Sequence, residues 1–481
     1  MPLSVCMDPL NTDRAGACHD GSMQPESPTP ARERGQEKGR SERPRPRERL
    51  ELEIEKLAFG GNGIARLDGY VVFVSGALPG DRVLAEVTKA KRGYAEATAV
   101  DLIRPSSDRI PDRCDHGGSA CPGAPWQGLP YEIQLEAKQS QVVDALDRIG
   151  GGTLAGYELE PIEPAVEQWR YRNKLEYSFG EADDGELLLG FHARGRWDEI
   201  VDANDCLLAS EANNEQRNAI RSWAVEAGLE AWDLRDRIGT LRNLIIREGR
   251  RTGQLQSRLV TSPAEIPRPP VDLHTVIEGD SGNTDGPTGV LGTEHLQERI
   301  CGLDVGIGHC AFFQTNTEMA EVLYGLAGEF AGLSGGERVF DLFCGIGTLG
   351  LTMADQAGEV WGLEIVEEAI ADAEENAERN GIDNATFLAG DARTGLGPLL
   401  EQAGRPDVVV VDPPRAGLSK KIVRRLIECE APRIVYVSCN PTTLAPNAVQ
   451  LSEAGYRLRR VKPVDMFPQT PHIECVAVLE R

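Results

Sequence analysis

Positively charged and aromatic residues are scarce in this chain of 481 residues. Lys and Arg number 51 against 76 Asp and Glu, so the formal net charge is −25, and aromatic residues make up only 5%. Taken alone, this acidic balance argues against a nucleic-acid partner, because phosphate binding relies on basic surface. The acid is spread along the whole chain. That distribution fits either an ordinary acidic enzyme or a protein of a salt-rich cytoplasm, where net charge maintains solubility.

Long hydrophobic runs and a disulfide framework are also missing. No apolar run reaches the ~18 residues that a membrane span needs, and the N-terminus lacks the pattern of a signal peptide. We therefore expect a cytoplasmic protein with no membrane partner, acting as a monomer. The eleven cysteines are odd in number and scattered, which predicts reduced thiols rather than a secreted disulfide scaffold.

The composition predicts roughly three globular domains after a tail. Residues 1–48 have almost no apolar pattern and are expected to be disordered, as a solvated linker or a basic arm that touches RNA. Residues 49–105 are expected to form a β-barrel, residues 106–305 a mixed α+β central domain, and residues 306–481 an α/β domain. Helical spacing of apolar residues predicts a helix near 130–150, which packs on the α/β domain.

Short apolar runs separated by glycine-rich turns predict the barrel. Closing five such strands gives a small barrel of the oligonucleotide-binding type. Its segment Lys89-Ala90-Lys91-Arg92-Gly93-Tyr94 places three cations beside an aromatic ring. This pattern fits contact with RNA phosphates and bases, and it fits a solvated hairpin tip equally well.

The last 170 residues alternate strands with helices. Such alternation predicts a parallel, doubly wound, Rossmann-like sheet whose ligands lie at the carboxyl ends of the strands. The predicted strands are residues 338–342, 359–363, 385–389, 407–411, 433–438, 456–464 and 474–480.

A glycine-rich turn follows the first of these strands. Gly345, Gly347 and Gly350 match the dinucleotide fingerprint, but the strand ends in Asp341, which repels a pyrophosphate and suits an ammonium group. Two more carboxylates, Glu364 and Asp391, follow the next two strands. Three acids at successive strand ends favour S-adenosylmethionine over a nicotinamide dinucleotide, whereas unrelated loop caps would explain each acid singly.

Two further strand ends carry reactive or rigid groups. Asp412 precedes two prolines, which fix the backbone into a stiff corner beside an acid. Cys439 lies between a strand and a helix N-terminus, where partial positive charge is expected to lower a thiol pKa. Glu474 opens the last strand, and partial desolvation there is expected to raise its pKa so that it accepts a proton.

These motifs together resemble those of the RNA uracil-5-methyltransferases, and the barrel resembles the TRAM domain of the branch that modifies 23S ribosomal RNA. The resemblance covers about residues 49–481. It rests on Phe312-Phe313-Gln314-Thr315-Asn316, Asp341-Leu342-Phe343-Cys344-Gly345, Asp412-Pro413-Pro414-Arg415, Ser438-Cys439-Asn440-Pro441 and His472-Ile473-Glu474, with Trp169-Arg170-Tyr171-Arg172-Asn173-Lys174 and residues 239–249 in the central part.

The resemblance implies a mechanism. The target uridine is flipped out of its RNA, Cys439 attacks uracil C6, C5 takes the methyl group of S-adenosylmethionine, and Glu474 removes the C5 proton. Thr348 stands where many relatives have Asn, and either side chain can form a hydrogen bond. By resemblance, the cofactor pocket draws on Gln314, Phe343, Thr348, Glu364, Asp391 and Asp412.

The ribosomal-RNA branch typically holds a 4Fe–4S cluster on four cysteines, and here the set is incomplete. Cys114, Cys121 and Cys206 match three of the ligands, but Ala124 occupies the remaining position and cannot bind iron. Three alternatives stay open: a cluster with one open iron site, a zinc site completed by His116, or loss of the metal with packing in its place.

Other functions compete with a 23S rRNA uracil-5-methyltransferase. A tRNA methyltransferase shares the motifs, although the tRNA-specific relatives usually lack the barrel. A DNA cytosine-5-methyltransferase also attacks C6 through a thiol, but it typically places Pro before the nucleophile, and here Ser438 precedes Cys439. An RNA-binding protein with a degenerate catalytic domain would need broken motifs, and both Cys439 and Glu474 are present.

Overall fold

The computed structural model describes residues 43–481 except 115–120, 234, 263, 265, 270–274, 281–288, 294 and 309–310. Most of the expected tail, and His116, therefore lie outside the described residues. The described chain divides into two compact units. The first comprises the chain up to Ala58 together with Asn62–Ser107. The second comprises Phe59–Gly61 and Asp108–Arg481. The expected boundary near residue 305 stays a prediction.

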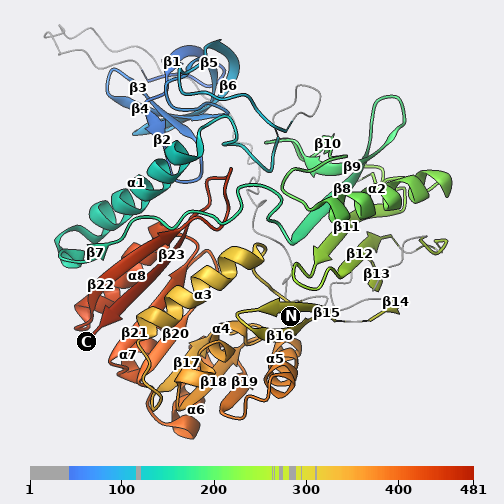
Figure 1. The fold of residues 1–481 in the computed structure, drawn as a ribbon. Helices are drawn as coiled ribbons and strands as arrows, with labels where there is room; N and C mark the ends of the chain where they lie inside the picture. The colour runs from blue at the N-terminus through green and yellow to red at the C-terminus, as the bar shows by residue number, and fades with distance from the viewer. Residues whose placement is uncertain are drawn as a thin grey trace, which may run out of the picture. The chain divides into compact units, whose positions relative to one another are not determined.

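The first unit is the expected barrel-like sheet, but it has six strands rather than five (Figure 1). The extra strand is a two-residue piece, because the first apolar run breaks at Ile54, whose side chain is buried under Gly63. Alternate side chains such as Val72, Val74 and Val83 fill the core. In sheet order the strands are β1 (Arg49–Glu53), β5 (Arg82–Ala90), β6 (Tyr94–Arg104), β4 (Tyr70–Ser75), β3 (Gly63–Leu67) and β2 (Lys56–Leu57).

The segment with three cations forms the β5–β6 turn of this unit. The Lys91 ammonium donates to the Tyr94 hydroxyl over 2.6 Å and lies 4.9 Å from the centre of its ring. Tyr94 in turn packs edge-on against Phe73. The turn is therefore an ordered cation–aromatic tip, and its contact with RNA stays a prediction.

The central part is built on a mixed sheet with one helix-covered face. Helix α2 (Glu211–Glu226) packs on β9 and β11 through Ile220, Trp223 and Ala224. Residues 263–295, which the sequence suggests to be a loop excursion, contribute two strands instead. The sheet order is β10 (Ile200–Asp202), β9 (Leu187–His192), β8 (Lys174–Glu181), β11 (Leu241–Glu248), β12 (Leu255–Thr261), β13 (Thr275–Asp280) and β14 (Gly289–Gly292). A separate hairpin, β15 (Leu296–Ile300) with β16 (Leu303–Ile307), follows.

The C-terminal part, which we call the catalytic part after the resemblance stated above, is built on an eight-stranded sheet. Every predicted strand is present within one residue of its expected bounds. The sheet order is β19 (Ala385–Ala389), β18 (Glu359–Glu364), β17 (Arg338–Leu342), β20 (Val408–Val411), β21 (Arg433–Ser438), β23 (Glu474–Glu480), β22 (Arg457–Val464) and β7 (Glu158–Leu159). The first five are parallel, but β23 runs antiparallel to β21 and β22. A short loop joins β22 to β23, and only a longer crossover allows a parallel pair.

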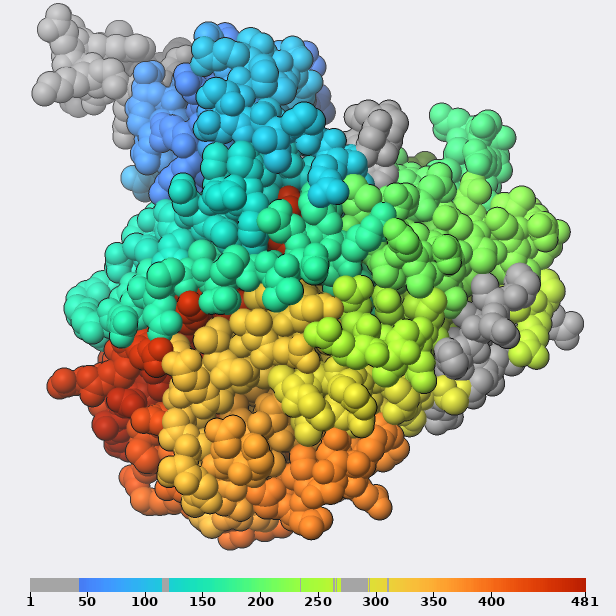
Figure 2. Space-filling view, in the orientation of Figure 1, coloured from blue at the N-terminus to red at the C-terminus, as the bar shows by residue number. Residues whose placement is uncertain are grey.

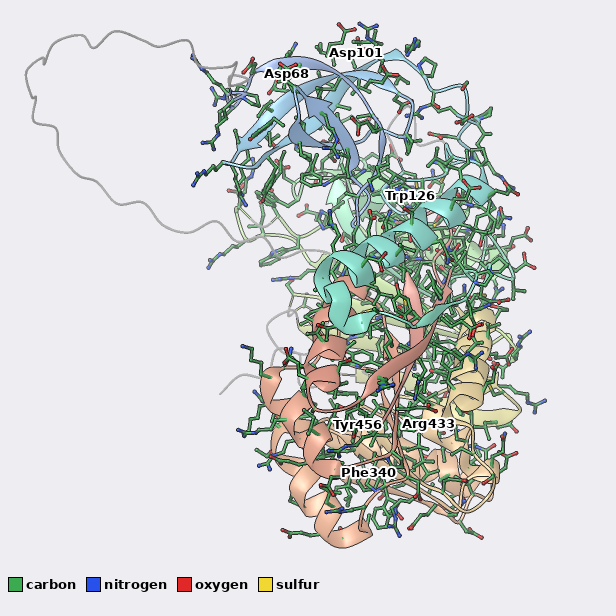
Figure 3. The ribbon with its side chains drawn as sticks, turned by 90° about the vertical axis from the view of Figure 1, so that its left-hand side faces the viewer. Asp68, Asp101, Trp126, Phe340, Arg433 and Tyr456 are labelled. Carbon is green, nitrogen blue, oxygen red and sulfur yellow. The ribbon has the colours of Figure 1, made fainter. Side chains whose placement is uncertain are left out.

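Helices cover both faces of this sheet, as Figure 1 shows. One face packs Val339, Val410 and Val435 against α3, and the other packs Phe340, Val411 and Tyr436 against α1, α7 and α8. Phe340 lies fully buried within this layer (Figure 3). The helices are α1 (Tyr131–Gly150), α3 (Thr317–Ala331), α4 (Thr348–Leu351), α5 (Glu367–Arg379), α6 (Ala392–Ala403), α7 (Lys420–Cys429) and α8 (Pro441–Glu453), with short 3-10 turns η1 (Gly151–Leu154) and η2 (Ala354–Gln356).

Helix α1 holds the β22–β23 loop through buried polar groups. The Lys138 ammonium donates to Asp465 Oδ1 over 2.5 Å and to the Phe467 carbonyl over 3.0 Å. Gln134 donates to Gln469 Oε1 and accepts from its backbone N–H. The loop that leads into Glu474 is thus fixed from outside the sheet. Among the described residues, no helix is long and apolar enough to cross a bilayer.

Candidate active site

The glycine turn between β17 and α4 has a tightly turned backbone. Phe343, Gly345 and Gly347 all adopt left-handed φ angles, of 67°, 53° and 81°. A Cβ on Gly347 would lie 2.9 Å from the Phe387 ring, so this position has no room for a side chain. The turn exposes backbone at the carboxyl end of β17, where a ligand is expected to bind.

Asp341 has one unused oxygen at this turn. Its Oδ2 accepts the Gly350 N–H over 2.8 Å, whereas no described residue hydrogen-bonds to the buried Oδ1. Burial raises the pKa of the Asp341 carboxyl to about 7. An unpaired buried acceptor is costly unless a ligand supplies the donor. The ammonium group of S-adenosylmethionine supplies such donors, so the residues at this turn fit that molecule.

Glu364 and Asp391 already have protein partners. The Glu364 carboxylate accepts the backbone N–H groups of Gly345, Ile365 and Val366 at 2.7–3.2 Å. Asp391 is the N-cap of α6 and is paired with Arg393, which holds its pKa below the usual range. Both acids lie at the expected strand ends, so a contact with the cofactor requires lone pairs beyond those used here.

The remaining predicted cofactor residues come from three elements. Gln314 donates to Asp412 Oδ2 over 3.4 Å, and burial raises the pKa of that carboxyl to about 7. Thr348 is buried at the start of α4 beside the Tyr324 hydroxyl, 3.3 Å away. Asn173 of the central part donates to the Gln314 carbonyl over 2.8 Å. The central and catalytic parts therefore share this corner.

Cys439 and Glu474 lie at the same edge of the sheet, near Asp412. The strands that carry them are neighbours, and Ser438 is paired with Cys475 in the register of β21 and β23. Burial raises the pKa of Glu474 well above its ordinary value, and the Asp412 carboxylate adds to this effect, as expected for a proton acceptor. A thiol and a raised-pKa carboxyl thus lie close enough for their charges to interact.

The expected low pKa of the Cys439 thiol is wrong. Burial first, then the Glu474 and Asp412 carboxylates, raise its pKa to about 12, and Arg415 opposes them. The partial charge of α8, whose first turn Asn440 caps by accepting the Thr442 N–H, does not outweigh burial and these two carboxylates. The thiol therefore needs a bound substrate or a nearby cation to ionise.

Two residues near Cys439 and Glu474 received no role from sequence reasoning. Arg415 opposes the raised pKa values of Cys439 and Glu474, and its carbonyl accepts from the Asn440 side chain over 3.1 Å. His472 packs edge-on against Phe467, and burial lowers its pKa to about 3, so it is neutral. Arg415 and His472 stood inside the quoted motifs, so their sequence signal was present but unassigned.

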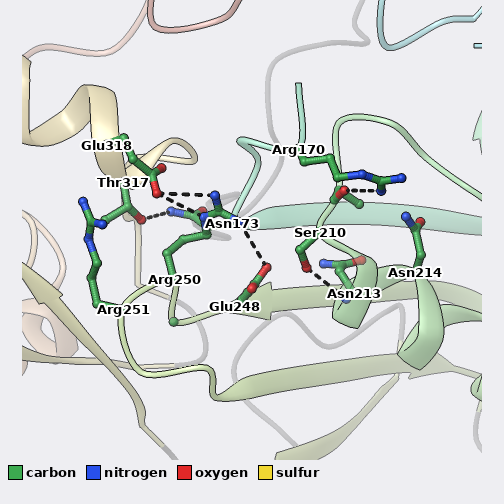
Figure 4. Close-up of polar contacts among 12 residues, drawn as sticks. Arg170, Asn173, Ser210, Asn213, Asn214, Glu248, Arg250, Arg251, Thr317 and Glu318 are labelled. Carbon is green, nitrogen blue, oxygen red and sulfur yellow. Dashed lines mark hydrogen bonds and ion pairs between the residues drawn. The ribbon is translucent and has the colours of Figure 1, made fainter. Parts of the chain in front are cut away.

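A separate open groove of about 790 Å³ lies between the central part and α3. Figure 2 shows yellow atoms of α3 meeting teal and green atoms of the central part there. Figure 4 shows its polar contacts, among them Arg250 with Glu318 at 3.3 Å. None of the predicted site residues lines it. Its four glutamates outnumber its three arginines, so it does not fit an RNA phosphate.

The three predicted metal-ligating cysteines come together, and Ala124 stands beside them in place of a fourth. Cys114 and Cys121 are buried against Ala124, whose methyl group is 1% exposed. The neighbouring Cys114 thiol and burial raise the pKa of Cys121, with a smaller effect from Cys206. Within the described residues, no three His, Cys, Asp or Glu side chains are arranged to hold a metal ion. These residues do not fit a 4Fe–4S cluster.

Comparison with known proteins agrees with this site. Residues 402–481 match the tRNA (uracil-5-)-methyltransferase family, residues 44–100 the TRAM domain and residues 339–428 a methyltransferase domain. An uncharacterized RNA methyltransferase of Halalkalibacterium halodurans is 38% identical over 89% of this chain and 95% of its own, and one of Porphyromonas gingivalis is 39% identical over 88% and 98%.

Among solved structures, the Pyrococcus abyssi tRNA (uracil-54, C5)-methyltransferase in complex with S-adenosyl-L-homocysteine matches with a TM-score of 0.73 and 29% identity, over 89% of this chain and all of that one. The expected fold and cofactor are thereby confirmed. The chain belongs to the TRAM-containing family of S-adenosylmethionine-dependent RNA uracil-5-methyltransferases.

Proposed function

We propose that this enzyme forms 5-methyluridine in 23S ribosomal RNA through a covalent bond between Cys439 and uracil C6. The observation that carries the proposal is the pairing of a thiol with a protonatable carboxyl, Glu474, at the ligand-binding edge of the sheet. Uracil C5 is a poor nucleophile by itself, and thiolate addition at C6 turns it into an enolate carbon.

Each of the proposed residues has a separate role in the reaction. Cys439 adds to C6, and Arg415 favours the thiolate over the thiol. Asp341, Thr348 and Gln314 hold the cofactor, with Phe343, Glu364, Asp391 and Asp412 around it. S-adenosylmethionine supplies an electrophilic methyl group for C5. Glu474 then takes the C5 proton, and the C6–S bond breaks to release Cys439 as the C5–C6 double bond returns.

Trapping the adduct tests this chemistry. A Glu474→Gln enzyme should accumulate a covalent protein–RNA complex that survives denaturing gel electrophoresis, because the C5 proton cannot leave. Cys439→Ala should form no such complex and no product. A Cys439→Ala enzyme with ordinary turnover would contradict the proposal.

A tRNA substrate is the second candidate, because the matching Pyrococcus abyssi enzyme acts on tRNA and covers 89% of this chain. The TRAM domain does not separate the two candidates, because a match over 89% of this chain extends into residues 44–100. The resemblance of Cys114, Cys121 and Cys206 to the ligand set of the ribosomal-RNA branch favours ribosomal RNA. Mass mapping of 5-methyluridine in 23S rRNA and tRNA from cells lacking the gene decides between them. Loss of the modification from tRNA alone would overturn the ribosomal assignment.

A further inference from the structure

The central sheet has one open face. In β8, Leu175, Tyr177 and Phe179 are buried in the core beneath α2, whereas the alternate residues Glu176 and Ser178 face away from it. Successive side chains of a strand point to opposite faces, so the same alternation continues across the neighbouring strands. Figure 1 shows α2 lying along these strands, and among the described residues it is the helix with the main contacts to β9 and β11.

Polar side chains form a chain of hydrogen bonds across this open face. Ser178 Oγ lies 3.2 Å from His192 Nε2 on β9 and accepts from Asn243 Nδ2 on β11 over 3.1 Å. His192 is exposed, and Asn243 is half-buried. Three adjacent strands thus present amide, hydroxyl and imidazole groups, which pair readily with nucleobase edges.

An exposed tryptophan follows β9, five residues beyond His192 along the chain. All six tryptophans are described, and Trp197, in the β9–β10 turn, is the one with more than half of its surface exposed, at 54%. The Arg235 guanidinium lies 5.6 Å from the ring centre and is held by Asp198, which also binds Arg196. The indole is therefore supported on one side and open to solvent elsewhere.

A second arginine–indole stack, Arg242 over Trp232 at 4.0 Å, occurs in the same part of the chain. Arg196 and Arg235 are already paired with a carboxylate, so they add little net charge for phosphates. Stacking and hydrogen bonding dominate such a surface. These interactions suit unpaired bases, whose faces and edges are accessible, and not the stacked interior of a duplex.

We propose that this open face binds a single-stranded segment of the substrate RNA, with Trp197 stacking on an unpaired base and the Ser178–His192–Asn243 chain contacting base edges. The proposal rests on the proposed function only in taking RNA as the substrate. It also accounts for how an acidic protein, at net charge −25, holds RNA: stacking depends little on salt, whereas phosphate contacts weaken steeply as salt rises.

Fluorescence anisotropy of the full chain with a labelled oligouridine of roughly ten nucleotides tests the surface, without S-adenosylmethionine. Trp197→Ala should raise the Kd about tenfold, and Trp197→Phe should restore most of the affinity, because a ring still stacks. The ratio of the mutant and wild-type Kd values should hold from about 0.1 to about 1 M KCl. Val225→Ala is the matched control, since Val225 is 53% exposed on α2, on the covered side of the sheet.

A Trp197→Ala Kd within twofold of the wild type would overturn the proposal. So would an equal loss of affinity for a blunt duplex of the same length, which would indicate phosphate binding. Binding at this face needs no methyl transfer. A failed adduct assay therefore does not affect the interpretation of the anisotropy result, and a failed anisotropy test does not affect that of the adduct assay. Melting temperatures of the variants identify any loss caused by unfolding.

Discussion

Replacing Lys138 by Met should destabilise the larger unit strongly. The Lys138 and Asp465 side chains are both 0% exposed and 2.5 Å apart, and Lys138 also donates to the Phe467 carbonyl. Removing the ammonium leaves a buried carboxylate to which, among the described side chains, the Tyr131 hydroxyl still donates, at 2.8 Å. Breaking one side of a buried pair costs about 3–5 kcal/mol, since the other charge stays desolvated.

Urea unfolding gives the free energy of this change. The matched control is Arg299→Met, which breaks an exposed pair with Asp304 at 2.8 Å, with side chains 62% and 55% exposed, and should leave the free energy of unfolding nearly unchanged because solvent screens the pair. Adding Asp465→Asn to Lys138→Met should recover much of the loss, because no charge is then left buried. The reasoning is refuted if Lys138→Met costs no more than Arg299→Met.

Three further predictions concern the pocket and the cysteines. With a thiol pKa of about 12, alkylation of Cys439 by iodoacetamide, followed by peptide mass spectrometry, should speed up roughly tenfold per pH unit between about pH 7 and about pH 9; a plateau in that range would contradict the raised pKa. Calorimetric affinity for S-adenosyl-L-homocysteine should rise from about pH 6 to about pH 8, because Asp341 ionises near 7 and only the carboxylate attracts the ligand's ammonium; Asp341→Asn should bind weakly at every pH, and a variant that kept the rise would refute this assignment. The wild type purified anaerobically should lack stoichiometric iron, whereas Ala124→Cys should take up iron and sulfide on reconstitution; about four irons per wild-type chain would show that three cysteines suffice.

Local patterns in the sequence were enough to predict the catalytic sheet. Val408–Val411 is buried on both faces and reads as a continuous apolar run, so its position needs no tertiary information. The thiol pKa of Cys439 could not be predicted in this way, because Glu474 and Asp412 approach it from other strands. The antiparallel direction of β23 was also missed, because the strand patterns alone do not distinguish a short loop from a long crossover.

The predicted cysteine ligands show the opposite case. The sequence motif correctly predicted that Cys114, Cys121 and Cys206 lie together. It could not show that they are buried with Ala124, on which their ability to bind a metal depends. Conversely, the β13 and β14 strands in residues 263–295 were missed, because Pro, Gly and Asp in that stretch are typical of loops and the pairing with β12 supplies the order.

Asn173 connects the central part of the enzyme to the segment that leads into α3. Its buried side chain, at the start of the central sheet, grips both the Gln314 carbonyl and the Thr317 hydroxyl, at 2.8 and 2.9 Å. A displacement of the central sheet would therefore be passed through these two hydrogen bonds to the segment that holds Gln314, the residue that touches Asp412. The segment before α3 is thus a direct structural connection between the central part and the cofactor residues.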